Sequence, residues 1–226
     1  MNYRRVLVFG AHPDDEIAMA GAIAKFAMRK VNVTIVTFTD GCEGYPKPEM
    51  KDTIVAVRRK ESSASDRVLG VSSHVHLEIP DMALINNKEN VLRCVHAIRK
   101  VRPDAIFTHG PDERHRDHIA AHAISVEASW QAGEPVAAEL GAPWRTPHLY
   151  FYGAVEGDKP HVCFDVSETE HKRLLAMAKH VSQHFLWGRS KENFEEEAKW
   201  IKRSKGKFIE HFYLSDGFCL NDFPPR

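Results

Sequence analysis

The sequence has no apolar run that approaches the roughly 20 residues of a membrane-spanning helix. It has no excess of either charge, because Lys+Arg and Asp+Glu both number 31. We therefore expect no membrane span, and no nucleic-acid or membrane surface recognised by bulk charge attraction. Since the first five residues lead directly into a predicted strand, no signal peptide is expected either.

Cysteine is scarce, and the sequence contains no C-x-x-C pair. This spacing argues against a disulfide framework and predicts a cytoplasmic protein in a reducing compartment. The chain of 226 residues, 43% of them hydrophobic, is long enough for one substantial core. Its 14 histidines are unusual and justify a search for metal ligands. The four cysteines are Cys42, Cys94, Cys163 and Cys219.

Strands and helices are predicted to alternate through the first 130 residues. Residues 4–9 form a short apolar run, 16–29 show helical spacing, and 31–38 form a second strand, so a βαβ unit is expected. The alternation predicts an α/β fold: one Rossmann-like three-layer domain over 1–226, with a mainly parallel sheet flanked by helices. Further strands are predicted at 73–79, 104–108, 148–152, 161–166 and 208–214, and further helices at 52–69, 88–101, 119–130, 167–180 and 192–205.

Two local features outside this pattern carry predictions of their own. Residues 131–147 are rich in Gly, Pro and Ala and are expected to be a long loop that covers the site or an interface. Ser167 and Glu170 have the spacing of a capping box at the start of a helix.

The segment Ala-His-Pro-Asp-Asp-Glu, at 11–16, stands where the first predicted strand passes into a helix. It brings one imidazole and three carboxylates to the carboxyl end of a strand, where open α/β sheets bind their ligands. Pro-Asp-Asp is also ordinary turn and helix-cap chemistry. Taken alone, the segment indicates either a turn or a site.

A second polar run, His115-Arg-Asp-His118, follows the strand predicted at 104–108. Two histidines three apart near a helix start are often only polar surface, but parallel strands bring both runs to the same edge of the sheet. His12, Asp15 and His118 then offer two nitrogens and one oxygen, which with an open position for water is the pattern of catalytic zinc. This donor set also leaves another divalent metal, such as Fe²⁺, open.

The remaining residues of the two runs suit hydrolysis by a metal-bound water. Zinc lowers the pKa of such a water to roughly 7. Asp14 is expected to point away from Asp15 and to take the proton, and His115 to donate to an oxyanion. Asp117 is expected to orient one of the imidazoles. The histidines with no carboxylate neighbour in sequence are interpreted as structural or surface residues: His74, His76, His96, His122, His171, His180 and His184.

Together, Ala-His-Pro-Asp-Asp-Glu and His-Arg-Asp-His resemble the motifs of the PIG-L/LmbE family of zinc-dependent N-acetylglucosamine deacetylases. Thr-Asp-Gly-Cys-Glu-Gly at 39–44, Arg-Arg-Lys-Glu at 58–61 and Pro-Asp at 80–81 extend the similarity, which runs from about residue 4 to 125. One departure is Arg116, where the family commonly has Pro. The ligand spacing is unaffected.

The resemblance implies removal of an acetyl group from an N-acetylated amino sugar or its conjugate, a small-molecule substrate. It implies zinc on His12, Asp15 and His118, Asp14 as general base and His115 as oxyanion stabiliser. It also implies that Arg58 contacts the substrate. Members of the family often assemble, so a homo-oligomer is left open.

Three alternatives compete with this function. The first is an amidase of the same fold that cleaves a larger acyl group, and the second is a non-catalytic metal- or sugar-binding protein. Asp14 and His115 argue against the second, because binding alone needs neither. Nucleotide binding is disfavoured, since the first turn lacks G-x-G-x-x-G and its carboxylates would repel phosphate. The group attached to the sugar stays open.

Overall fold

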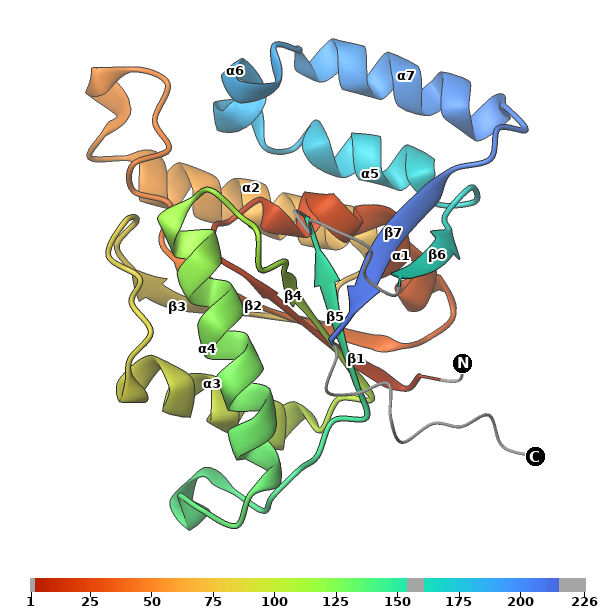
Figure 1. Ribbon diagram of the computed structural model, residues 1–226. Helices are drawn as coiled ribbons and strands as arrows, with labels where there is room; N and C mark the ends of the chain where they lie inside the picture. Colours follow the sequence, from red (N-terminus) through yellow and green to blue (C-terminus); the bar gives the residue numbers. More distant parts are fainter. Residues whose placement is uncertain (1–2, 154–160, 216–226) are drawn as a thin grey trace, which may run out of the picture.

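The computed structural model describes residues 3–153 and 161–215, which contain one seven-stranded sheet in the order β3-β2-β1-β4-β5-β7-β6 (Figure 1). The first five strands along the chain are parallel, and β7 runs antiparallel to both β5 and β6. The predicted α/β fold with a mainly parallel sheet is confirmed. The strands are β1 (Arg5–Gly10), β2 (Asn32–Thr39), β3 (Ser73–Ile79), β4 (Ala105–His109), β5 (His148–Tyr152), β6 (His161–Asp165) and β7 (Ile209–Leu214).

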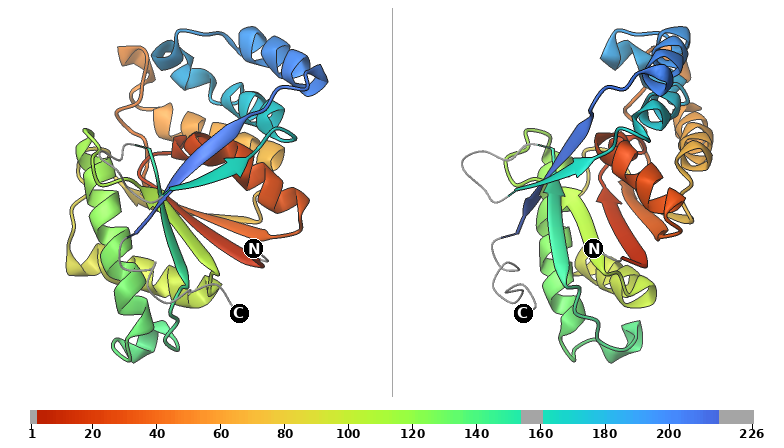
Figure 2. Two further views of the ribbon diagram at one scale, coloured as in Figure 1. Left: turned by 45° about the vertical axis from the view of Figure 1, so that its right-hand side comes forward. Right: turned by 90° about the vertical axis from the view of Figure 1, so that its right-hand side faces the viewer.

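Helices cover both faces of the sheet and make three layers, as the two views of Figure 2 show. One face carries α1, α2 and α5, with α6 and α7 packed outside them, and the other carries α3 and α4. That the whole of 1–226 forms a single domain stays a prediction. The helices are α1 (Ala20–Met28), α2 (Ile54–Leu69), α3 (Lys88–Val101), α4 (Arg116–Gly133), α5 (Glu170–Met177), α6 (His184–Trp187) and α7 (Lys191–Arg203).

The central strand β1 is apolar along its length because helices bury both of its faces. Val6 and Val8 point to the side of α1 and share a core with Ile23. Leu7 and Phe9 point to the opposite side, where α3 and α4 supply the packing partners. A strand anchored on both faces holds the chain that leaves its carboxyl end in a defined place.

Tertiary hydrogen bonds overturn the predicted capping box. The residue that caps α5 is Thr169, and no side chain caps the helix end. Ser167 Oγ instead accepts a hydrogen bond from the backbone amide of Phe208, and Thr169 Oγ1 donates to the carbonyl of Gly21. These two side chains connect α5 to its neighbours rather than to its own first turn.

The predicted loop at 131–147 is partly wrong, because α4 continues to Gly133. The rest of the segment precedes β5 and so lies at the amino edge of the sheet, away from the polar runs. The buried guanidinium of Arg99 holds it by donating to the carbonyls of Ala137, Gly141 and Glu134. The segment therefore does not cover the site.

No helix in the described ranges, 3–153 and 161–215, has the length and apolar character needed to cross a bilayer. Cys42, Cys94 and Cys163 are free thiols. Cys219 lies outside the described residues.

Candidate active site

The two polar runs meet where the strand order of the sheet reverses. From β1 the chain moves outward to β2 and β3, then crosses back to β4 on the other side of β1. Open α/β sheets bind ligands at such a switch point, beyond the carboxyl ends of the strands. The segment at 11–16 leaves β1, and His115 to His118 follow β4, which pairs directly with β1.

His12, Asp15 and His118 converge at this point. His12 Nδ1 lies 3.1 Å from His118 Nε2 and 3.6 Å from Asp15 Oδ2, and His118 Nε2 lies 3.5 Å from Asp15 Oδ1. Ligand atoms around a tetrahedral zinc ion with bonds of 2.0–2.1 Å are about 3.3 Å apart. The two imidazole nitrogens are therefore spaced as ligands of a small divalent metal ion, and the Asp15 carboxylate stands beside both rings, with one oxygen toward each.

The second ring nitrogen of His12 contacts Asp117, because Asp117 Oδ2 lies 3.2 Å from His12 Nε2. Asp117 is fully buried and is held by the backbone amide of Met82, which donates to the same oxygen. Burial would lower the pKa of His12, but its hydrogen bonds to Asp117 and Asp15, and the charge of Asp81, raise it to about 10. Surroundings that favour a proton this strongly also favour a metal cation.

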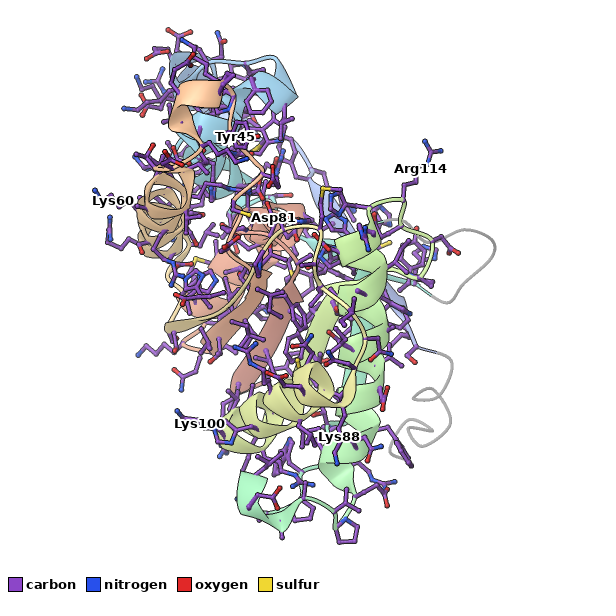
Figure 3. The ribbon with its side chains drawn as sticks, turned by 90° about the vertical axis from the view of Figure 1, so that its left-hand side faces the viewer. Tyr45, Lys60, Asp81, Lys88, Lys100 and Arg114 are labelled. Carbon is purple, nitrogen blue, oxygen red and sulfur yellow. The ribbon has the colours of Figure 1, made fainter. Side chains whose placement is uncertain are left out.

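Asp81, labelled in Figure 3 above the sheet, stands at the end of β3 between α2 and the start of α4. Its Oδ1 is 4.0 Å from His12 Nε2, and its Oδ2 is 3.9 Å from Arg58 Nη1. It also accepts hydrogen bonds from the backbone amides of Gly41 and Glu43. The Asp81 carboxylate thus connects the loop after β2 to His12 and to Arg58.

Asp14 points away from Asp15 toward the buried guanidinium of Arg58, whose Nη2 donates to Asp14 Oδ1 at 2.8 Å. Arg58 also donates to the carbonyl of Gly41. Burial raises the pKa of Asp14, although the positive charge of Arg58 opposes the shift. A Cβ on Gly44 would stand 2.3 Å from Arg58 Nη1, so a larger residue there would displace the guanidinium from this position.

His115 is the N-cap residue of α4, and its Nδ1 accepts a hydrogen bond from the backbone amide of Asp117. In this geometry the proton of the neutral ring is on Nε2. Burial, followed by the nearby charges of His12 and His118, lowers the pKa of His115. The side chain is 46% exposed and its ring lies edge-on to that of His12, so a neutral N–H donor stands beside the ligand cluster.

A cavity of about 240 Å³ opens beside the cluster. A larger one, of about 850 Å³, lies between β2, β3 and α3 and contains none of these residues. The smaller cavity is the candidate substrate pocket, because Asp14, Asp15 and His118 line it. Besides Asp14, Asp15 and His118, its walls include Ile17, Ala18, His109, Glu113, Tyr152, Gly153 and Trp187.

Sequence reasoning assigned no role to His109 or Glu113. His109 Nε2 lies 3.0 Å from Asp15 Oδ2, and Glu113 Oε2 lies 3.3 Å from His118 Nδ1, so each contacts a candidate metal ligand from behind. Their position in the polar run after β4 was the available signal. Nothing local could have identified Tyr152 or Trp187, which reach the cavity from later elements.

His180 has a carboxylate partner that its sequence neighbours do not reveal. It is fully buried, and its Nε2 lies 2.9 Å from Oε1 of Glu16, which also accepts from Ser65 Oγ on α2. The pair braces the turn that carries Asp14 and Asp15. His74 likewise pairs with Asp66, 2.9 Å away, so for both histidines a partner distant in sequence replaces the missing neighbour.

The fold and this cluster define an α/β protein with a candidate metal centre at the switch point of its sheet. Residues 7–129, more than half of the chain, match the family model described as PIG-L: GlcNAc-PI de-N-acetylase. The chain belongs to the PIG-L family, and the resemblance seen in its motifs is confirmed.

Known proteins resemble the chain in sequence and in fold. A 1D-myo-inositol 2-acetamido-2-deoxy-alpha-D-glucopyranoside deacetylase of Streptomyces avermitilis is 33% identical, over 66% of this chain and 60% of that protein. The chain thus spans only part of the length of this relative. An N,N'-diacetylchitobiose deacetylase from Pyrococcus horikoshii superposes with a TM-score of 0.80 at 26% identity, over 96% of this chain and 85% of its own.

The fold alone is shared with a 4-carboxy-2-hydroxymuconate hydratase from Pseudomonas putida. Its TM-score is 0.75 at 21% identity, over 93% of this chain and 95% of its own. Because one fold can carry unrelated chemistry, the function must be argued from the site.

Proposed function

We propose that the chain is a zinc-dependent N-deacetylase. Its reaction adds water to the acetamide of an N-acetylglucosamine-type sugar or conjugate and releases acetate and the free amine. The observation that carries the proposal is the convergence of His12, Asp15 and His118, with side-chain atoms 3.1–3.6 Å apart, beside the carboxylate of Asp14, whose side chain is 15% exposed. Membership of the PIG-L family and the deacetylases among the similar proteins support it.

Zinc held by His12, Asp15 and His118 would supply a nucleophilic water at neutral pH and polarise the acetamide carbonyl. Asp14 takes the proton of the attacking water and later gives it to the departing amine. Burial raises its pKa, which makes the carboxylate a stronger base and so favours the uptake of this proton. The Nε2–H of His115 donates to the oxygen that becomes negative during the attack.

Two further residues hold this arrangement in place. Asp117 fixes the His12 ring through Nε2, which leaves Nδ1 turned toward His118 and Asp15. Arg58 is buried and does not line the cavity, so its contact with the substrate stays a prediction, while its hydrogen bond to Asp14 supports a different task, the orientation of the base. A cytoplasmic location and a homo-oligomeric state remain predictions.

The test is acetate release by the zinc-loaded protein from free N-acetylglucosamine, N,N'-diacetylchitobiose, and glycosides with anionic, inositol or lipid aglycones. Asp14→Asn is run beside the wild type, and Asp52→Asn, at an exposed position before α2, is the matched control. We expect release by the wild type and the control but not by Asp14→Asn. Release of a longer acyl group alone would favour the amidase. Silence toward every amide, with zinc bound, would overturn the proposal.

A further inference from the structure

A second set of metal-binding side chains lies on β6 and β7, away from the strands that carry the candidate active site. The antiparallel register places Cys163 directly opposite His211, and His161 opposite Tyr213. Cys163 Sγ lies 3.7 Å from His211 Nδ1. One ligand atom each from His161, Cys163 and His211 fall within 4.8 Å of one another.

All three side chains share the outer face of this strand pair because strand residues alternate between faces. Val162, Phe164 and Phe212 point the other way and join the core beside α1. Exposed polar residues on the outer face of a sheet are ordinary. The convergence of two imidazoles and one thiol there indicates a metal site, since these groups bind zinc and similar metals strongly.

The distance between Cys163 Sγ and His211 Nδ1 agrees with one metal ion shared by the two strands. With zinc–sulfur and zinc–nitrogen bonds of about 2.3 and 2.0–2.1 Å, a sulfur and a nitrogen ligand in tetrahedral geometry are about 3.6 Å apart. The observed distance from Cys163 Sγ to His211 Nδ1 is 3.7 Å. The exposed position leaves the fourth place to water or to an incoming ligand.

We propose that His161, Cys163 and His211 form a second binding site for a borderline-soft divalent cation such as Zn²⁺. Cys163 binds as the thiolate, and its proton passes to solvent. The site shares no residue with the cluster at 12–15 and 115–118. It joins β6, the last strand in the sheet order, to β7 through side chains as well as through backbone hydrogen bonds.

A metal clamp at this place acts on the edge of the sheet. Within 3–153 and 161–215, β6 pairs only with β7, so its ordering depends on that one neighbour. A cation that binds the paired strands and not the separated ones stabilises the pairing by mass action. We therefore expect amide hydrogen exchange in β6 to slow when the site is filled.

Cobalt distinguishes this site from the candidate active centre. Co²⁺ bound to a thiolate gives a charge-transfer absorption in the near ultraviolet, and the ligands at 12, 15 and 118 include no thiolate. Titration of the metal-free wild type with Co²⁺ is expected to produce this band. Cys163→Ser and His161→Ala are expected to lose it, while Cys42→Ala, which removes a different free thiol, keeps it.

The same variants separate this proposal from the deacetylase proposal. Cys163→Ser should keep the wild-type acetate release, because Cys163 lies outside the catalytic cluster, and should bind one equivalent of Co²⁺ fewer than the wild type. Absence of the band in the wild type, or its survival in Cys163→Ser, would overturn the second site. Neither result would bear on the deacetylase function proposed for the candidate active site.

Discussion

At the switch point, the carboxylate of Asp14 combines low exposure with a raised pKa and stands outside the ligand cluster. It shares the short segment after β1 with two of the candidate ligands, yet its side chain turns toward α2. A base must stand near the metal without binding it, and this change of direction between two adjacent aspartates meets the requirement.

Asp14→Asn should retain the metal and lose turnover by roughly 10²–10⁴-fold, because general base catalysis contributes about that much. Metal content by elemental analysis and the rate of acetate release are measured on the same sample. His118→Ala is the complementary variant and should lose the metal. Normal turnover by Asp14→Asn would refute the assignment of the base.

Arg58→Met should move the acidic limb of the pH profile for kcat/KM to higher pH. The charge of Arg58 lowers the pKa of Asp14 against the effect of burial, so its removal lets that pKa rise further. A carboxylate base works only when ionised. With a higher pKa, Asp14 is protonated at a higher pH, so the variant should lose activity earlier than the wild type during acidification. Arg58→Lys keeps the charge and should shift the limb less. An unmoved limb in Arg58→Met would contradict the coupling.

At the scale of elements, the turn that carries Asp14 and Asp15 depends on segments remote in sequence. Glu16 at its end bonds to Ser65 on α2 and to His180 before α6. Beside it, Ser182 donates to Glu61 on α2, and Gln183 donates to the carbonyl of Gly44. The C-terminal helices thereby brace the site from one side.

His180→Ala should destabilise the protein by roughly 3–5 kcal/mol, because it leaves the buried Glu16 carboxylate without its partner. Urea unfolding followed by circular dichroism measures the loss. Glu78→Ala, which breaks the exposed pair of Glu78 with Arg59, is the matched control and should cost at most about 1 kcal/mol. An equal loss of unfolding free energy in the two variants would show that the buried pair of His180 with Glu16 stabilises the protein no more than the exposed pair does.

At the scale of the whole molecule, the candidate metal centre lies at the rim of a core that the helices and the sheet form without it. Removing the metal with a chelator should therefore lower the melting temperature while the far-ultraviolet circular dichroism of the folded protein is kept. At a metal concentration a thousandfold above the dissociation constant, the lost stabilisation is about 4 kcal/mol.

This melting experiment is done in the Cys163→Ser background, so that only the first site contributes. Asp14→Asn should show the same response to the chelator, and His118→Ala should show none. A collapse of secondary structure on chelation would mean that the metal is needed to fold the chain.

The sequence predicted the local elements well wherever periodicity alone decides them. The bounds predicted for β3, α3 and β5 agree with the structure, because alternating burial, helical burial and a short buried run each leave a recognisable pattern over neighbouring residues. The capping box at Ser167 failed for the opposite reason. Ser167 Oγ accepts a hydrogen bond from the amide of Phe208, and the N-cap residue Thr169 donates to the carbonyl of Gly21, which a local pattern cannot reveal.

The alternation of strand and helix and the polar residue types that follow β1 and β4 can be read directly from the amino-acid sequence, because both depend on patterns over a few residues. That β4 pairs with β1, that Arg58 holds Asp14 and that His180 holds Glu16 became apparent only in the folded chain. These contacts join residues 44 and 164 positions apart in the last two cases. They arise from the order in which strands pack into the sheet, which depends on the burial of all the elements together.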